Sequence, residues 1–82
     1  MNEKERVFQL LRKLSGVEPT DEKDTLLGNL GLDSLNMITM LLDIETEFEI
    51  RLHESDMNPY DLIWVSDVIN LVEKYVGGRN EK

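Results

Sequence analysis

Apolar residues recur along the chain at the three- and four-residue spacing that is typical of amphipathic helices, and no stretch alternates as a half-buried strand would. Gly16 stands where the first of these stretches ends, and glycine commonly terminates a helix. We therefore expect a first helix that ends just before Gly16 and buries one stripe, formed by Val7, Leu10, Leu11 and Leu14.

The stretch from residue 17 to residue 33 lacks strong periodicity and contains Gly28 and Gly31. It is too long for an ordinary helix connection, and it is too rich in leucine for a disordered linker. We expect an ordered loop pinned to the core by its leucines, which are Leu26, Leu27, Leu30 and Leu32.

A second helix is predicted from about Ser34 to Glu49, and it carries two apolar strips. The core stripe comprises Met37, Leu41, Ile44 and Phe48, with Met40 at its flank. The second strip comprises Leu35, Ile38 and Leu42. Burial of a helix needs one stripe, so the second indicates either deep burial or a partner surface, and the small size of the domain favours the partner surface.

The remainder of the chain predicts one short and one longer helix. Asn58 followed by Pro59 is typical of the start of a short helix. A last helix is expected over about residues 65–76, ended by Gly77 and Gly78, with residues 79–82 as a frayed tail. Its apolar face comprises Val65, Val68, Ile69, Val72, Tyr75 and Val76.

These elements predict an all-α fold in a single domain spanning residues 1–78. The expected architecture is a four-helix bundle with three longer helices, one short third helix and a long ordered loop between the first two.

Charge and composition narrow the function classes. The 82 residues carry a net charge of −8, and residues 15–56 alone hold eleven acidic and two basic residues, a net charge of −9. Such a chain repels phosphate backbones and anionic membrane surfaces, and no apolar run is long enough to span a bilayer. We expect a soluble, cytoplasmic, monomeric protein that binds neither nucleic acid nor membrane.

The chain has no cysteine and one histidine, which excludes disulfides, thiolate metal sites and a cysteine nucleophile. One local group of residues is of chemical interest: Leu30-Gly31-Leu32-Asp33-Ser34-Leu35 places a serine where a loop meets a helix. Asp33 or Ser34 is expected to be the N-cap. A nucleophilic serine would need a nearby base, and the only imidazole, His53, lies about 25 Å further along the second helix axis. We therefore expect no enzyme activity and no metal site.

The hexapeptide at 30–35 resembles the phosphopantetheine attachment motif of acyl and peptidyl carrier proteins. The order of helices and the acidity match this family as well, and the resemblance covers essentially residues 3–76.

The resemblance implies that a phosphopantetheinyl transferase joins 4′-phosphopantetheine from coenzyme A to the hydroxyl of Ser34. Asp33 would support this transfer, and Gly31 would let the loop approach closely. The thiol of the group would then carry acyl or aminoacyl intermediates as thioesters, in biosynthesis of the fatty acid, polyketide or nonribosomal peptide type. The alternative is a helical protein-interaction module that has the carrier fold but no prosthetic group.

In this family the second helix is the recognition surface for the loading enzyme and the downstream synthase enzymes. The resemblance thus gives the second strip, Leu35, Ile38 and Leu42, the role of apolar contacts. Its acidic rim would meet basic patches on partners and comprises Asp43, Glu45, Glu47 and Glu49.

Two departures from the family pattern bear on the partners. Fatty-acid carriers typically have acids at the positions of Asn36 and Thr39, so the front of this helix is less acidic, which favours a specialised or peptidyl-type carrier. Trp64 stands where a small capping residue is usual. We expect Trp64 in or near the core, the alternatives being a cargo contact or a cap displaced to Ser66.

Overall fold

The computed structural model describes residues 3–18 and 21–79 of the chain. Within these ranges the fold is all-helical, which confirms the expected class, and the only strand-like feature is an isolated antiparallel bridge between Thr25 and Trp64. The α-helices are α1 (Glu3–Ser15), α2 (Ser34–Phe48) and α3 (Val65–Arg79), and two single 3₁₀ turns, η1 (Glu54–Asp56) and η2 (Pro59–Asp61), lie between α2 and α3.

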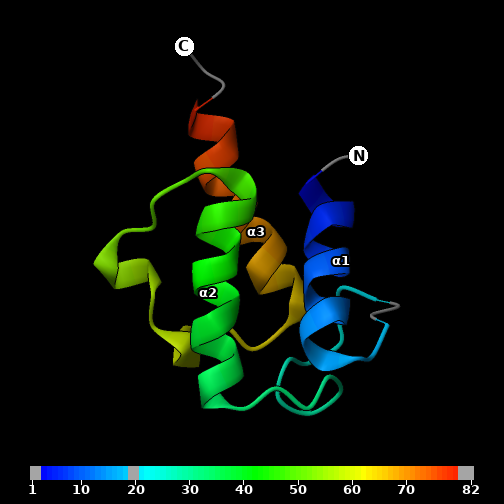
Figure 1. The fold of residues 1–82 in the computed structure, drawn as a ribbon. Helices are drawn as coiled ribbons and strands as arrows, with labels where there is room; N and C mark the ends of the chain where they lie inside the picture. The colour runs from blue at the N-terminus through cyan, green and yellow to red at the C-terminus, as the bar shows by residue number, and fades with distance from the viewer. Residues whose placement is uncertain (1–2, 19–20, 80–82) are drawn as a thin grey trace.

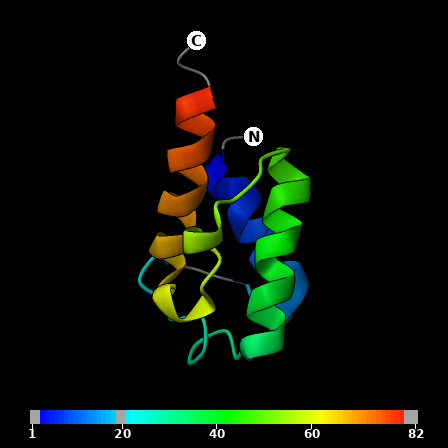
Figure 2. The same ribbon diagram turned by 90° about the vertical axis from the view of Figure 1, so that its left-hand side faces the viewer.

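The three α-helices pack against one another, with α1 in contact with both α2 and α3 (Figure 1). The loop before α2 and the chain around η2 both lie at the end of the bundle where α2 begins, as Figures 1 and 2 show from two directions. The expected short third helix is η2, where Asn58 Oδ1 accepts the Tyr60 N–H at 3.0 Å. The turn η1 was not predicted.

The core consists of the predicted stripes. Every member of the expected core stripe of α2 is buried, as are Val7 and Leu11 of α1. Leu10 and Leu14, which were expected in the same stripe of α1, are partly buried against the core. Helix α3 contributes Val65, Val68, Ile69, Leu71, Val72 and Val76, with Tyr75 partly buried.

The loop between α1 and α2 is pinned to the core as expected, through Leu26, Leu30 and Leu32. Leu27 is different: its side chain is 58% exposed, so its predicted anchoring role is wrong. The loop is held by backbone pairing, in which the Leu26 N–H donates to the Ile63 carbonyl at 2.9 Å. Because the Leu26 side chain faces the core, the Leu27 side chain beside it turns to solvent.

Trp64 is 44% exposed and therefore not in the core. It lies opposite Thr25 in the bridge, and the backbone pairing holds residues 63 and 64 at the surface, where both side chains are exposed. Val65, the first residue of α3, is fully buried. The capping side chain here is Asp67 and not Ser66, since Asp67 Oδ2 accepts the N–H groups of Ile63 and Trp64.

Gly77 and Gly78 do not end the last helix, which continues to Arg79. Glycine disfavours a helix by only about 1 kcal/mol, so two of them are compatible with a last turn. By contrast, Gly16 adopts φ +73° and ends α1, as predicted. Of the expected frayed tail, residues 80–82 lie outside the described residues.

A polar cluster ties η1 to the second half of α3. The Tyr75 hydroxyl donates to Asp56 Oδ2 at 2.5 Å and accepts the His53 backbone N–H at 2.9 Å. Lys74 Nζ donates to the same carboxylate oxygen of Asp56 at 3.1 Å. The bonds from Tyr75 and then Lys74 hold the pKa of Asp56 below its usual range.

Tyr75→Phe should therefore lower the free energy of unfolding at pH 7 by about 1 kcal/mol, because both partners of the hydroxyl lose a hydrogen bond. The pKa of Asp56 is lower in the folded protein than its ordinary value of 3.8. The ionised Asp56 carboxylate therefore contributes its full stabilisation at pH values above 3.8, and this stabilisation is lost as the pH falls through the pKa of Asp56 in the folded protein. Urea denaturation should show the difference between variant and wild type narrowing below about pH 4. Tyr60→Phe, at an exposed tyrosine, is the control, and equal stability of Tyr75→Phe and wild type at pH 7 would contradict the assignment.

Candidate functional site

Ser34 is the first residue of α2, and Asp33 is its N-cap. Asp33 has extended backbone angles, φ −95° and ψ −178°, so the chain turns into the helix between these two residues. Of the two residues that the sequence allows as the cap, the structure selects Asp33.

A reciprocal capping box fixes this turn. Asp33 Oδ1 accepts the Asn36 backbone N–H at 2.8 Å, and Asn36 Oδ1 accepts the Asp33 backbone N–H at 3.3 Å. Such a box satisfies two backbone donors that a helix start leaves unpaired. Asn36 was not predicted in this role, because the usual residues at this third helical position are Glu and Gln.

Because Asp33 is the N-cap, the Ser34 hydroxyl is not needed to cap the helix. The residue is exposed, and the hydroxyl makes no hydrogen bond to any residue in the described ranges. A serine acting as the N-cap would instead direct its oxygen to a backbone N–H of the first turn.

Gly31 shapes the approach to this site through its backbone. It adopts φ +67°, in the left-handed region that favours glycine, and a Cβ placed there would meet no atom within 4 Å. Within the folded chain, a side chain at position 31 would therefore not collide with a neighbouring segment, so close packing does not explain this glycine. The reason is the turn that carries the chain from Leu30 to buried Leu32 and then to Asp33.

The residues at this end of α2 fit a phosphodiester on the Ser34 oxygen. The first turn presents unpaired backbone N–H groups and the positive end of the helix dipole, and it contains no acidic side chain. The one neighbouring carboxylate, Asp33, has an oxygen committed to the cap.

Nothing at this site resembles a hydrolytic centre. His53 lies beyond the other end of α2, where its ring is 5.8 Å from the ring of Tyr75. In the described part of the chain no three His, Cys, Asp or Glu side chains are grouped to hold a metal ion. Over the same residues, no helix has the length and apolar character needed to cross a membrane.

The second strip of α2 is exposed, as its predicted role as a partner surface requires. Leu35 is 71% exposed, Ile38 44% and Leu42 50%. These side chains start directly beside Ser34 and continue along the helix.

The acidic residues of the predicted rim differ from one another in their surroundings. Glu47 binds Arg6 of α1, with Arg6 Nη2 2.9 Å from Glu47 Oε2 and 2.6 Å from the Glu47 carbonyl oxygen. The same guanidinium lies over the Phe48 ring, 4.5 Å from its centroid. Glu45 Oε2 accepts the Leu52 N–H at 2.8 Å and so helps to close α2.

The side chains of the two other rim residues, Asp43 and Glu49, are both exposed. Glu49 is the C-cap of α2, in the left-handed conformation at φ 55°, and its N–H donates to the Glu45 carbonyl. Asp43 is an exposed residue in the middle of the helix.

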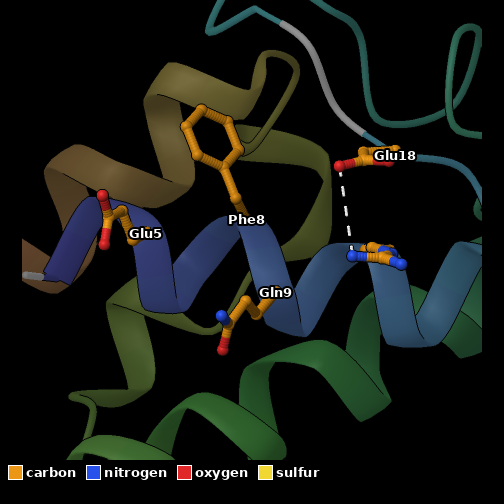
Figure 3. Close-up of a pocket in the computed structure, with 5 residues that line it drawn as sticks. Glu5, Phe8, Gln9 and Glu18 are labelled. Carbon is orange, nitrogen blue, oxygen red and sulfur yellow. Dashed lines mark ion pairs between the residues drawn. The ribbon is translucent and has the colours of Figure 1, made fainter. Parts of the chain in front are cut away.

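A shallow pocket lies away from α2, between α1 and the start of the following loop (Figure 3). Phe8 projects from α1 into it, and Glu18 faces the helix across an ion pair of 4.0 Å with Arg12. None of the pocket's lining residues belongs to α2, so it is separate from the Ser34 site.

The comparison with known families agrees with this geometry. Residues 5–72 match the family model described as "Phosphopantetheine attachment site", so the chain belongs to this family. The members of the family are carrier proteins, which are generally non-catalytic.

Similar proteins include complete small carriers and segments of large synthases. The chain is 27% identical to the acyl carrier protein of Thermotoga maritima over 88% of this chain and 89% of that protein. It is 32% identical to the D-alanyl carrier protein of Leuconostoc citreum over 90% and 96% of the respective chains. It is also 38% identical to part of the non-reducing polyketide synthase tazA of Aspergillus terreus, covering 87% of this chain but only 3% of the synthase.

The fold agrees as well. The crystal structure of an acyl carrier protein from Thermotoga maritima superposes with a TM-score of 0.75 at 24% identity, covering 95% of each chain. The chain is thus a carrier protein of the acyl carrier family, with a covalent 4′-phosphopantetheine group and a role in biosynthesis.

The capping role of Asp33 can be tested through stability alone. Asp33→Ala should lower the free energy of unfolding by about 1 kcal/mol, because the Asn36 N–H loses its acceptor. Asp33→Ser is the matched control, since serine caps helices almost as well as aspartate. Chemical denaturation followed by circular dichroism measures both, and an equal loss in the two variants would contradict capping as the cause.

Proposed function

We propose that the Ser34 hydroxyl is the attachment point of the 4′-phosphopantetheine group. The observation that supports this proposal is at the start of α2, where Asp33 caps the helix and Ser34 stays exposed, with its oxygen outside the cap. A hydroxyl that is fixed in position and is not needed for folding is well suited to modification by another enzyme.

In the proposed reaction, Ser34 Oγ forms a bond to the phosphorus that bears the pantetheine in coenzyme A. The bond from that phosphorus to the adenosine bisphosphate breaks, and a base on the transferase takes the proton of Oγ. The unpaired N–H groups of the first turn of α2 stabilise the negative charge of the resulting phosphodiester.

Asp33 has two roles in this proposal. Its Oδ1 holds the helix start, so the position of Ser34 is defined before the transferase binds. Its second oxygen, Oδ2, assists the metal ion that accompanies coenzyme A, or the Ser34 hydroxyl, at the transferase interface.

The protein itself has no catalytic activity in this proposal, because the single imidazole of the chain, His53, lies beyond the other end of α2 and cannot act as a base on Ser34 or its cargo. The chain also has no cysteine, so the thiol that binds cargo belongs to the prosthetic group. Small relatives named as acyl carriers and as D-alanyl carriers both align along most of this chain. The cargo is accordingly an acyl or aminoacyl thioester.

Partner enzymes then reach the cargo by docking on α2. The exposed second strip of this helix, Leu35, Ile38 and Leu42, supplies the apolar contacts. The partners are the phosphopantetheinyl transferase, the enzyme that loads the cargo, and the synthase enzymes that consume it.

Incubation with coenzyme A and a broad-specificity phosphopantetheinyl transferase should add the mass of one phosphopantetheine to the wild-type protein and none to Ser34→Ala. Because the helix cap belongs to Asp33, Ser34→Ala should keep its free energy of unfolding within about 0.5 kcal/mol of wild type. Intact-mass spectrometry and chemical denaturation measure the two quantities.

Ser55→Ala, which removes another exposed serine, is the matched control and should be modified like wild type. Modification of folded Ser34→Ala to the wild-type extent would contradict the assignment of Ser34.

A further inference from the structure

The first nine residues of α2, positions 34–42, carry no charged side chain. The first acid of the helix is Asp43, more than two turns from Ser34. The exposed side chains nearest to Ser34 along the helix are therefore apolar or neutral, although the chain as a whole has a charge of −8.

More apolar side chains are exposed at the same end of the bundle. The loop before α2 and the chain that leads from η2 into α3 both close this end (Figures 1 and 2). They expose Leu27 from the loop, and Ile63 and Trp64 from the segment before α3.

Hydrogen bonds hold the backbone segments that carry this second group of side chains. Asp67 Oδ2 accepts the N–H of Ile63 at 2.9 Å and that of Trp64 at 3.0 Å, while the carbonyl of Ile63 accepts the Leu26 N–H. A backbone that is already held in place loses little conformational entropy when a partner binds the side chains on it.

Two of the four acids further along α2 are engaged within the protein. Glu47 is bound by Arg6, and Glu45 accepts the Leu52 N–H. A partner that relied on ion pairs with these two acids would have to compete with their internal contacts. The other two acids, Asp43 and Glu49, lie more than two turns from Ser34.

We propose that the transferase that loads Ser34 docks on this carrier through an uncharged, apolar face, and not through a basic one. This inference rests on the proposed function of Ser34. Charge matching carries the choice of partner. Beyond Asp33, which has one oxygen in the helix cap, the face along positions 34–42 offers no charge to a basic partner, whose cations would be desolvated there without compensation.

Asn36 and Thr39 allow a test that leaves the helix start intact. Position 36 is the third residue of the capping box, where Glu and Gln are both regular occupants, so either substitution keeps the box. Thr39 is exposed on the same helix. Asn36→Glu with Thr39→Glu adds two charges, and Asn36→Gln with Thr39→Gln is the uncharged control of similar size.

The experiment compares two purified phosphopantetheinyl transferases, one with a basic docking face and one with an apolar docking face, on the full-length apo protein. Loading is followed by intact mass as kcat/KM, from about 50 to 500 mM NaCl. Wild type and the Gln/Gln control should be loaded by the apolar-faced enzyme, with little change across the salt range, and about tenfold more slowly by the basic-faced one. The Glu/Glu variant should narrow or reverse this preference, and salt should then suppress its loading by the basic-faced enzyme.

Equal or faster loading of wild type by the basic-faced enzyme, suppressed by salt, would overturn the proposal while leaving Ser34 as the modified residue. The absence of loading by both enzymes would instead overturn the proposed function and this inference with it. Self-association of wild type at assay concentration, relieved by Leu35→Asp in sedimentation analysis, would also overturn the proposal, since the surface would then belong to a second copy of the chain.

Discussion

Burial of one stripe of α2 is the constraint on which the rest of the structure depends. Met37, Leu41, Ile44 and Phe48 are buried in the core that α1, α3 and the loop leucines complete, and this fixes the rotation of α2 about its own axis. With that rotation set, the helical period of 3.6 residues leaves the second strip, which begins at Leu35, facing solvent. The same packing that stabilises the domain therefore also exposes the proposed docking surface.

At the start of α2, the helix cap and the proposed attachment point fall on adjacent residues, Asp33 and Ser34. Asp33 satisfies the backbone donors of the first turn, and Asn36 completes the box from the other side. The proposed modification of Ser34 would not weaken the fold, since the Ser34 oxygen takes no part in the cap. Had the serine been the cap, attaching a phosphodiester would have removed a hydrogen bond on which the helix depends.

Much of this could be predicted from the sequence, because its signals are local. The stripes of α1, α2 and α3 follow from helical periodicity, the end of α1 from Gly16, and the start of η2 from Asn58 and Pro59. The incorrect predictions for Trp64 and Leu27 have a nonlocal cause. Trp64 and Leu27 are exposed because two segments far apart in sequence pair through their backbones. The pairing of Glu47 with Arg6, 41 residues away, depends on how α1 packs against α2, which no local pattern reveals. The continuation of α3 through its glycines reflects the small cost that each imposes.

Protein purified from the cells that make it would show directly whether Ser34 carries the prosthetic group. Proteolysis and tandem mass spectrometry would locate the modification within the peptide that contains residues 30–35. We expect one phosphopantetheine on Ser34 and an unmodified side chain at every other serine and threonine. A phosphopantetheine on a different residue, such as Ser55 or Ser66, would show that Ser34 is not the attachment point.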